Sequence, residues 1–177
     1  MKKQLLIIPT LIFLFILINF FYLLLIDRNP TEIPSNLLNK NVPEFETESL
    51  FKKEKFTSSE EFGEEIMLVN FFATWCKPCR DEHVYIKRFS DEKKIRIIGI
   101  NYKDDNKKVI RWLKNLGNPY SDIPIDKNGR IAIDWGVYGI PETFIVNKKG
   151  IIKYRHVGPI NRKIFKKLNS LIEEIKQ

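Results

Sequence analysis

The sequence predicts an α/β domain in which helices flank a mixed β-sheet, preceded by one N-terminal transmembrane helix. Two continuous apolar runs, IMLVNFFA (66–73) and IRIIGINY (95–102), are typical of strands buried on both faces of a sheet. Each run is followed by apolar residues at helical spacing, and alternation of strands and helices favours parallel strands with right-handed crossovers. The segment ETFIVNKKGIIKYRHVG (142–158) then predicts a β-hairpin, which adds antiparallel strands to the sheet.

An uncharged segment of 23 residues, from Gln4 to Ile26, follows Lys2 and Lys3. As a helix that rises about 1.5 Å per residue it spans roughly 35 Å, which is enough to cross a bilayer. The segment is longer than the apolar region of a signal peptide, and no small-residue cleavage site follows it. We therefore expect an uncleaved membrane anchor at residues 4–26.

The anchor divides the rest of the chain into three parts. Lysines before the span and few after it favour a cytoplasmic tail at residues 1–3. Pro30 and Pro34 favour an extended tether at residues 27–40, and the folded domain is expected at residues 41–177. The domain is thus expected to face the periplasm from a bacterial inner membrane that the chain crosses once.

The positive charge of the chain does not indicate a nucleic-acid partner. The formal net charge is +8, but the lysines are spread along the sequence and usually alternate with acidic residues. A surface that binds nucleic acid concentrates its basic residues on one face or in one run. We therefore expect a solvated, lysine-rich surface and no nucleic-acid binding.

Two helices have boundaries that the sequence indicates. Asp105 is expected to cap the N-terminus of a helix that ends at Gly117, because Asp favours N-caps and Gly favours the position after a helix. A final amphipathic helix is expected from Asn161 onward, with an apolar face that covers the sheet.

The two cysteines of the chain, Cys76 and Cys79, lie where the first predicted strand leads into a helix. Two cysteines at this spacing suit a redox pair, a metal site or a structural disulfide. A structural disulfide is disfavoured because so small a loop adds little stability. A metal site is disfavoured because the only other soft or imidazole ligands are two methionines, His83 and His156, so no metal and no cofactor are expected.

The position of each cysteine suggests its role in a redox pair. Cys76 at the first turn of a helix faces unpaired backbone N–H groups and the positive end of the helix dipole, and Lys77 adds a nearby positive charge. We therefore expect Cys76 to be the exposed nucleophile with a lowered pKa. Cys79 lies one turn further along and is expected to attack a mixed disulfide formed at Cys76.

Several motifs together resemble one family. They are LVNFFATWCKPCRDEH (68–83), INYKDD (100–105), WLKNLGNPY (112–120), GVYGIPETF (136–144) and YRHVGPI (154–160). The combination resembles the membrane-tethered thiol:disulfide interchange proteins of cytochrome c maturation, the CcmG/DsbE family of the thioredoxin superfamily. The resemblance implies a thioredoxin-like fold.

The resemblance also implies a function. Members of the family reduce the disulfide of the haem-binding CxxCH motif in apocytochrome c, directly or through a partner thiol protein, so that haem is attached. A membrane electron conduit re-reduces them. The alternatives are a general extracytoplasmic thiol–disulfide oxidoreductase and a metal-carrying or purely binding module with the same fold.

Four residues near the cysteines complete the expected site. The resemblance implies that Pro141 forms a cis peptide bond facing the cysteines and that Glu142 is an acidic site residue, expected to bind basic substrates. Glu82 follows Cys79 by three residues, so it lies on the same helical face and is either the acceptor of the Cys79 proton or a solvated helix residue. Trp75 is expected to shield Cys76 and to contact the substrate.

Three other positions carry expectations. Asn70 occupies the place where thioredoxins usually carry a buried aspartate. An asparagine at this place is usual in the CcmG/DsbE family. Trp135 and Tyr138 suit either the lining of the substrate groove or the core of the domain. Val84 stands where family members often have a proline, which puts the helix kink expected there in doubt.

Overall fold

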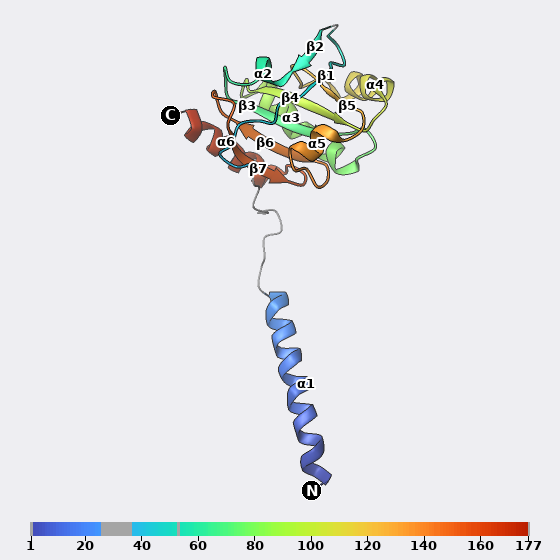
Figure 1. Cartoon of the computed structure of the whole chain (residues 1–177), viewed down its shortest axis with the longest axis vertical. Coiled ribbons are helices and arrows are strands. Elements are labelled where there is room, and N and C mark those ends of the chain that lie inside the picture. The colour runs from blue at the N-terminus through green and yellow to red at the C-terminus, as the bar shows by residue number, and fades with distance from the viewer. Residues whose placement is uncertain (1, 26–36, 53, 177) are drawn as a thin grey trace. The chain divides into compact units, whose positions relative to one another are not determined.

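A computed structural model describes residues 2–25, 37–52 and 54–176 of the 177-residue chain (Figure 1). The chain divides into two units, Met1–Pro30 and Thr31–Gln177, which we treat separately. The first unit contains helix α1 (Lys2–Leu25), and most of its large apolar side chains between Ile7 and Leu23 are exposed. Within the part of the chain that the structure describes, no helix combines the length and the apolar character needed to cross a membrane.

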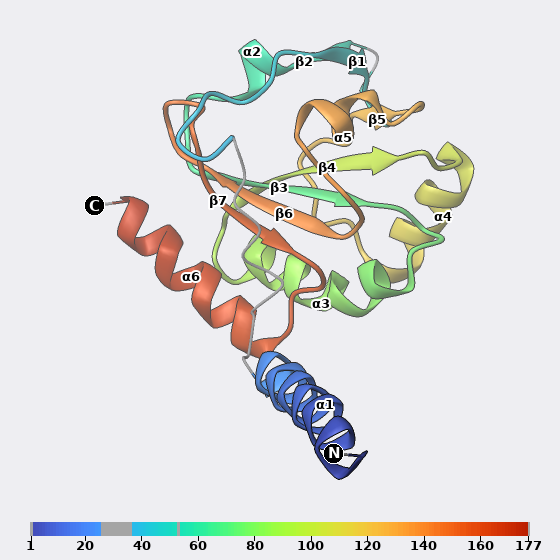
Figure 2. The ribbon, with the colours of Figure 1, turned by 60° about the horizontal axis from the view of Figure 1, so that its bottom comes forward.

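The second unit is built on a five-stranded mixed sheet, as the sequence predicts (Figure 2). The three strands β5, β4 and β3 are parallel, whereas β6 and β7 run antiparallel to their neighbours. Every residue of β3 is buried, because this strand pairs on both sides and is covered on both faces. The strands, in their order across the sheet, are β5 (Ile125–Asp126), β4 (Arg96–Tyr102), β3 (Met67–Phe72), β6 (Glu142–Val146) and β7 (Ile152–Val157).

Three helices cover one face of this sheet: α3 (Lys77–Asp91), α4 (Asn106–Leu116) and α6 (Arg162–Lys176). Successive side chains of a strand point to opposite faces, so Leu68 and Phe72 of β3 pack with these helices. Their core includes ring contacts such as the stack of Phe72 on Tyr120, with ring centroids 4.7 Å apart.

The other face is covered by four short elements that the sequence analysis did not identify. They are β1 (Glu46–Glu48), β2 (Lys55–Thr57), α2 (Ser58–Glu61) and α5 (Arg130–Asp134), and Figure 2 shows them together on the side of the sheet away from α3 and α6. Elements of three to five residues are too short to show a helical or strand period, so the sequence carries no pattern for them. Phe56 and Trp135 pack there against Phe71 of β3 and its neighbours.

The predicted helix boundaries are confirmed. Asp105 accepts a hydrogen bond from the Lys108 N–H, as an N-cap does, and Gly117 follows α4 with a φ of 88°. Asn161 accepts hydrogen bonds from the N–H groups of Lys163 and Ile164 at the start of α6.

Part of the expected tether belongs to the packed domain. The Asn39 N–H donates to the Ile152 carbonyl, and the Ile152 N–H donates to the Lys40 carbonyl. Leu37 packs against the core on the β1–β2 side. The rest of the tether, at residues 27–36, and Ile26 of the expected anchor lie outside the described residues.

A glycine in β4 makes room for the Tyr120 ring. A Cβ atom at Gly99 would lie 2.6 Å from Cδ1 of Tyr120, which is too close for the ring to keep its place. We expect Gly99→Ala to lower the free energy of unfolding by about 1–3 kcal/mol, as overpacked cores do. Urea unfolding of the oxidised protein measures this. The matched control is Gly139→Ala, which meets no heavy atom within 4 Å, and an equal loss in both variants would contradict the assigned role of Gly99.

Candidate redox site

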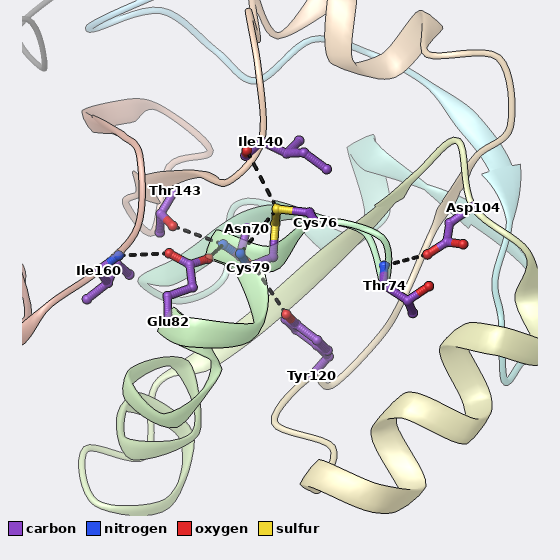
Figure 3. The surroundings of a disulfide bond; sticks show 10 residues. All are labelled: Asn70, Thr74, Cys76, Cys79, Glu82, Asp104, Tyr120, Ile140, Thr143 and Ile160. Carbon is purple, nitrogen blue, oxygen red and sulfur yellow. Dashed lines mark hydrogen bonds between the residues drawn. A yellow bond between two sulfur atoms is a disulfide. The ribbon is translucent and has the colours of Figure 1, made fainter.

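The two cysteines form a disulfide where β3 leads into α3 (Figure 3). Their sulfur atoms are 2.02 Å apart. Cys76 is the N-cap residue of α3, and its Sγ accepts a hydrogen bond of 3.1 Å from the Cys79 N–H. Upstream, the Thr74 N–H donates to the Asp104 carboxylate, which ties this turn to the loop after β4. In the dithiol form the same N–H group and the helix dipole stabilise a thiolate at Cys76.

Exposure distinguishes the two cysteines less than expected. Cys76 has a relative exposure of 5% and Cys79 of 2% in the disulfide form, so both cysteines are buried in this form. The reason is the neighbouring backbone, because the Ile140 carbonyl oxygen lies 3.6 Å from the Cys76 Sγ. What sets Cys76 apart in this structure is its place at the helix N-terminus.

The peptide bond between Ile140 and Pro141 is cis, as expected. The Pro141 carbonyl accepts a hydrogen bond from the Gly158 N–H, which joins this turn to the end of β7. The turn faces the disulfide, since the residue before Pro141 carries the carbonyl that contacts Cys76 (Figure 3).

A buried polar network lies on the α3 side of the sheet, next to the disulfide (Figure 3). The Asn70 Nδ2 group donates to Glu82 Oε1 at 2.8 Å and to the Thr143 hydroxyl at 3.0 Å. The Tyr120 hydroxyl donates to Asn70 Oδ1 at 3.0 Å, and the Ile160 N–H donates to Glu82 Oε2 at 2.9 Å. Elements far apart in the sequence therefore meet at one amide.

Glu82 is buried in this network, with a relative exposure of 1%. Burial raises the pKa of its carboxyl to about 8, while the hydrogen bonds from Ile160 and Asn70 act in the opposite direction. Burial likewise raises the pKa of Tyr120 well above its ordinary value, so its hydroxyl remains a donor. Glu82 is therefore not a solvated surface residue, and it shares one helical face with Cys79.

Glu142 has a different environment from the one the sequence suggests. Its side chain is fully buried on the opposite face of the sheet, where it forms an ion pair of 2.7 Å with Arg155. The carboxylate also accepts hydrogen bonds from the N–H groups of Tyr138 and Gly139. The expectation that this charge contacts a basic substrate is corrected, because the carboxylate has no surface left to offer.

The aromatic residues near the disulfide fall into two groups. Trp75 and Tyr138 are 60% and 73% exposed, and the Trp75 Nε1 group donates to the Lys103 carbonyl. Trp135 is fully buried against Phe144 in the core on the β1–β2 side, so of its two alternatives the structure shows the core residue. Sequence alone does not tell which of these aromatic residues are exposed and which are buried, because the residue type is the same in both environments.

The two histidines and Val84 do not form part of a metal site or of a helix kink among the described residues. His83 and His156 are both buried, and His83 Nε2 lies 2.9 Å from the Gly117 carbonyl oxygen. Among the described residues, no three His, Cys, Asp or Glu side chains group as metal ligands do. Helix α3 continues through Val84, whose side chain is more than half exposed, so the missing proline leaves the helix intact.

Sequence reasoning did not single out Tyr120, Thr143, Arg155 or Asp104. Tyr120 and Asp104 contribute through loops with no periodic pattern. Thr143 had one available signal, since the alternation of β6 places it on the opposite face from Glu142. Arg155 pairs across the hairpin with Phe144, and a charged residue inside a β-rich run was the only sign of its burial.

The chain matches the Redoxin protein family over residues 37–172. It is similar to the thiol:disulfide interchange protein DsbE of Escherichia coli K12, with 42% identity over 180 residues that cover 99% of this chain and 94% of the relative. The DsbE protein of Pseudomonas aeruginosa is 39% identical over 166 residues, which cover 94% of this chain and 91% of the relative.

The fold also has counterparts among solved structures. A crystal structure of a Chlorobium tepidum protein assigned as a thiol:disulfide interchange protein DsbE aligns with a TM-score of 0.69. The alignment covers 78% of this chain and 96% of that protein at 20% identity, which supports the expected thioredoxin-like fold. Near-full-length identity to the curated relatives, joined to a paired CxxC motif at a helix N-terminus, shows that the chain is a thiol:disulfide oxidoreductase and belongs to the DsbE (CcmG) family.

Proposed function

We propose that this protein is a periplasmic reductase of cytochrome c maturation. Its dithiol, Cys76 and Cys79, delivers two electrons to the disulfide of the CxxCH motif in apocytochrome c, directly or through a partner thiol protein. The observation that carries the proposal is the Cys76 sulfur at the N-terminus of α3, where the Cys79 N–H donates to it. The family relationship supports the choice of substrate.

The first step is attack by the Cys76 thiolate on one sulfur of the substrate disulfide. A bond forms between Cys76 and that sulfur, the substrate disulfide breaks, and the other substrate sulfur leaves as a thiolate. The helix N-terminus favours the thiolate form of Cys76. The exposed Trp75 and Tyr138 and the turn at Pro141 are the surfaces that a polypeptide substrate meets beside Cys76.

The second step releases the reduced substrate. The Cys79 thiol loses its proton and attacks the Cys76 sulfur, so the disulfide of the present structure forms and the substrate leaves as its second thiolate. Glu82 is the proton acceptor in this proposal, through the fraction of the protein in which its carboxyl is ionised, acting directly or through a water molecule. A pKa of about 8 lies close to that of a thiol, which is the match that general base catalysis favours. The acceptor then returns the proton to the departing thiolate.

The oxidised protein requires a source of two electrons before it acts again. We propose that a membrane electron conduit supplies them, through the same exchange run in reverse at Cys76. We propose the same location for the domain, next to the membrane that would hold this partner. The uncharged segment at residues 4–26, preceded by Lys2 and Lys3, suits an anchor that keeps the domain in the periplasm.

The substrate assignment is tested by trapping. Cys79→Ala removes the resolving thiol, so Cys76 should remain covalently attached to the polypeptide it attacks. We expect non-reducing gels of cells that express this variant to show a mixed disulfide, and mass spectrometry to identify apocytochrome c or a thiol protein of haem attachment. The matched control is Cys76→Ala, which should form no adduct. Adducts of a broad range of periplasmic proteins would instead indicate a general oxidoreductase.

The role of Glu82 is tested with Glu82→Gln. We expect resolution of the mixed disulfide to slow about tenfold or more, as the loss of a general base does. The initial attack by Cys76 should change less than twofold, because the helix N-terminus and not Glu82 is proposed to stabilise its thiolate. Rapid-quench analysis of a peptide mixed disulfide separates the two rates. The control is Glu92→Gln at the exposed end of the same helix, and an unaltered resolution rate across the pH range would remove Glu82 from the mechanism.

The same variant should change how stability depends on pH. Between about pH 4.5, the ordinary value, and pH 8 the unfolded chain releases the Glu82 proton while the native protein retains it. Stability from this group is therefore present below pH 4.5 and lost as the pH rises to 8, a change on the order of a few kcal/mol. We expect the stability of Glu82→Gln not to fall in this way, because glutamine does not titrate. Urea unfolding should therefore show the free energy of unfolding of the variant increasing relative to that of wild type from pH 5 to pH 8.

The location is tested by protease accessibility. Protease added to cells with a permeabilised outer membrane should degrade the domain, because residues 41–177 are expected to face the periplasm. The intact protein should sediment with the membrane fraction, and a cytoplasmic marker protein serves as the control for an unbroken inner membrane. Release of a soluble form cut near Asp27 would show that residues 4–26 act as a signal peptide instead.

A further inference from the structure

The segment Gly136–Ile140 leads from α5 to the cis-proline turn and lies beside the disulfide. Its last carbonyl, that of Ile140, is 3.6 Å from the Cys76 Sγ. Its central residue, Tyr138, is 73% exposed, and tyrosine is a residue type enriched at interfaces. We call residues 136–140 the docking segment.

A buried ion pair between Glu142 and Arg155 binds the backbone of the docking segment. Glu142 Oε1 accepts hydrogen bonds from the Tyr138 N–H at 2.9 Å and the Gly139 N–H at 3.4 Å. Glu142 Oε2 accepts from Arg155 Nε at 2.7 Å, and Arg155 Nη2 also donates to the Gly136 carbonyl at 2.8 Å. One guanidinium therefore binds the start of the segment directly and its middle through Glu142.

The guanidinium also contacts the ring that the segment exposes. The Arg155 Cζ atom lies 4.9 Å from the centroid of the Tyr138 ring and 5.7 Å from that of Phe144. A cation at this distance from an aromatic ring is attracted to it. The ring is thus held from the protein side while most of its surface remains in solvent.

Burial makes this arrangement specific to arginine. The side chains of Arg155 and Glu142 are 3% and 0% exposed, so salt in solution screens their attraction little. A planar guanidinium donates through fixed, separate N–H groups to Glu142 and Gly136 at once, whereas a lysine ammonium is a compact charge that does not reproduce the fork. The pair therefore fixes geometry in addition to neutralising charge.

We infer that Arg155 is a positioning residue for recognition of polypeptide disulfides. Acting through Glu142, it holds the docking segment so that the Tyr138 ring and the Ile140 backbone stand beside Cys76 as a preformed surface for an extended peptide. The inference rests on the proposed function only in that the substrate is a polypeptide. It replaces the expected direct role of Glu142 in binding with an indirect one, since Glu142 has no exposed surface.

Steady-state reduction assays on the full-length protein test this inference. The variant is Arg155→Lys, and the substrates are an oxidised CxxCH peptide, an oxidised peptide of the same composition without the histidine after the second cysteine, and a small aromatic disulfide. We expect KM for both peptides to rise about tenfold with kcat changed less than about threefold, because uniform binding is lost. The small disulfide does not span the docking segment, so its rate of reduction should fall less than kcat/KM for the peptides does. The two decreases should differ by a factor of at least about five.

Two further variants control the experiment. Arg130→Lys makes the same chemical change in an exposed ion pair with Asp134 and should leave all three substrates unaffected. Tyr138→Ala removes an exposed ring, so the fold is retained, and it should raise KM for the peptides in the same way. Amide exchange adds a direct readout, because the N–H groups of Tyr138 and Gly139 should exchange faster in Arg155→Lys than in wild type.

Each outcome decides a separate point. A parallel loss for peptides and the small disulfide in Arg155→Lys, or no loss at all, overturns the inference. An unchanged KM in Tyr138→Ala also overturns it, whether or not Arg155→Lys folds. If wild type reduces only the peptide without the histidine, the cytochrome assignment fails, while the positioning role of Arg155 is still decided by the variants on that peptide.

Discussion

The position of β3 in the centre of the sheet is the constraint on which the redox site depends. This strand pairs with β4 on one side and with β6 on the other, and each of its residues is buried. Its C-terminal end delivers Cys76 to the start of α3, and its pairing with β6 brings Pro141 and the residues after it alongside. The reactive sulfur and the cis-proline turn, more than sixty residues apart in sequence, meet because they extend from neighbouring strands.

Two buried carboxylates lie on opposite faces of the sheet and are stabilised in different ways. Glu82 lies on the α3 face, where burial without a cationic partner raises the pKa of its carboxyl although two neutral donors bind it. Glu142 lies on the other face and is paired with a guanidinium. A carboxylate without a cation suits proton exchange, and a carboxylate with one suits fixed structure. Alternation along β6 decides which environment a residue enters, because Thr143 joins the Asn70 network while Glu142 does not.

The sequence allowed the redox pair and the main layers to be predicted because their signals are local. Continuous apolar runs marked β3 and β4, and a CxxC pair after a strand marked a helix N-terminus. The small elements over the second face were missed, since β1 and β2 have three residues each and α5 has five, and such lengths show no period.

The errors at the site had a different origin. Glu142 was assigned to the substrate surface from its place in a motif and Trp135 was left open between groove and core, because sequence does not determine on which side of a sheet a residue lies. The partners that settled the matter, Arg155 for Glu142 and Phe144 for Trp135, come from strand pairing and core packing. The sequence does not state how the strands pair, so it does not identify these partners.

Asn70 determines how many protons the buried network holds. Its amide accepts from Tyr120 on one side and donates to Glu82 and Thr143 on the other, so the network contains one carboxyl group. An aspartate in the same place would set two carboxylates in hydrogen-bond contact, and like charges so close share a single proton with two coupled macroscopic pKa values. The amide makes the titration that of a single acid, and protonation of Glu82 alone sets the charge state behind the disulfide.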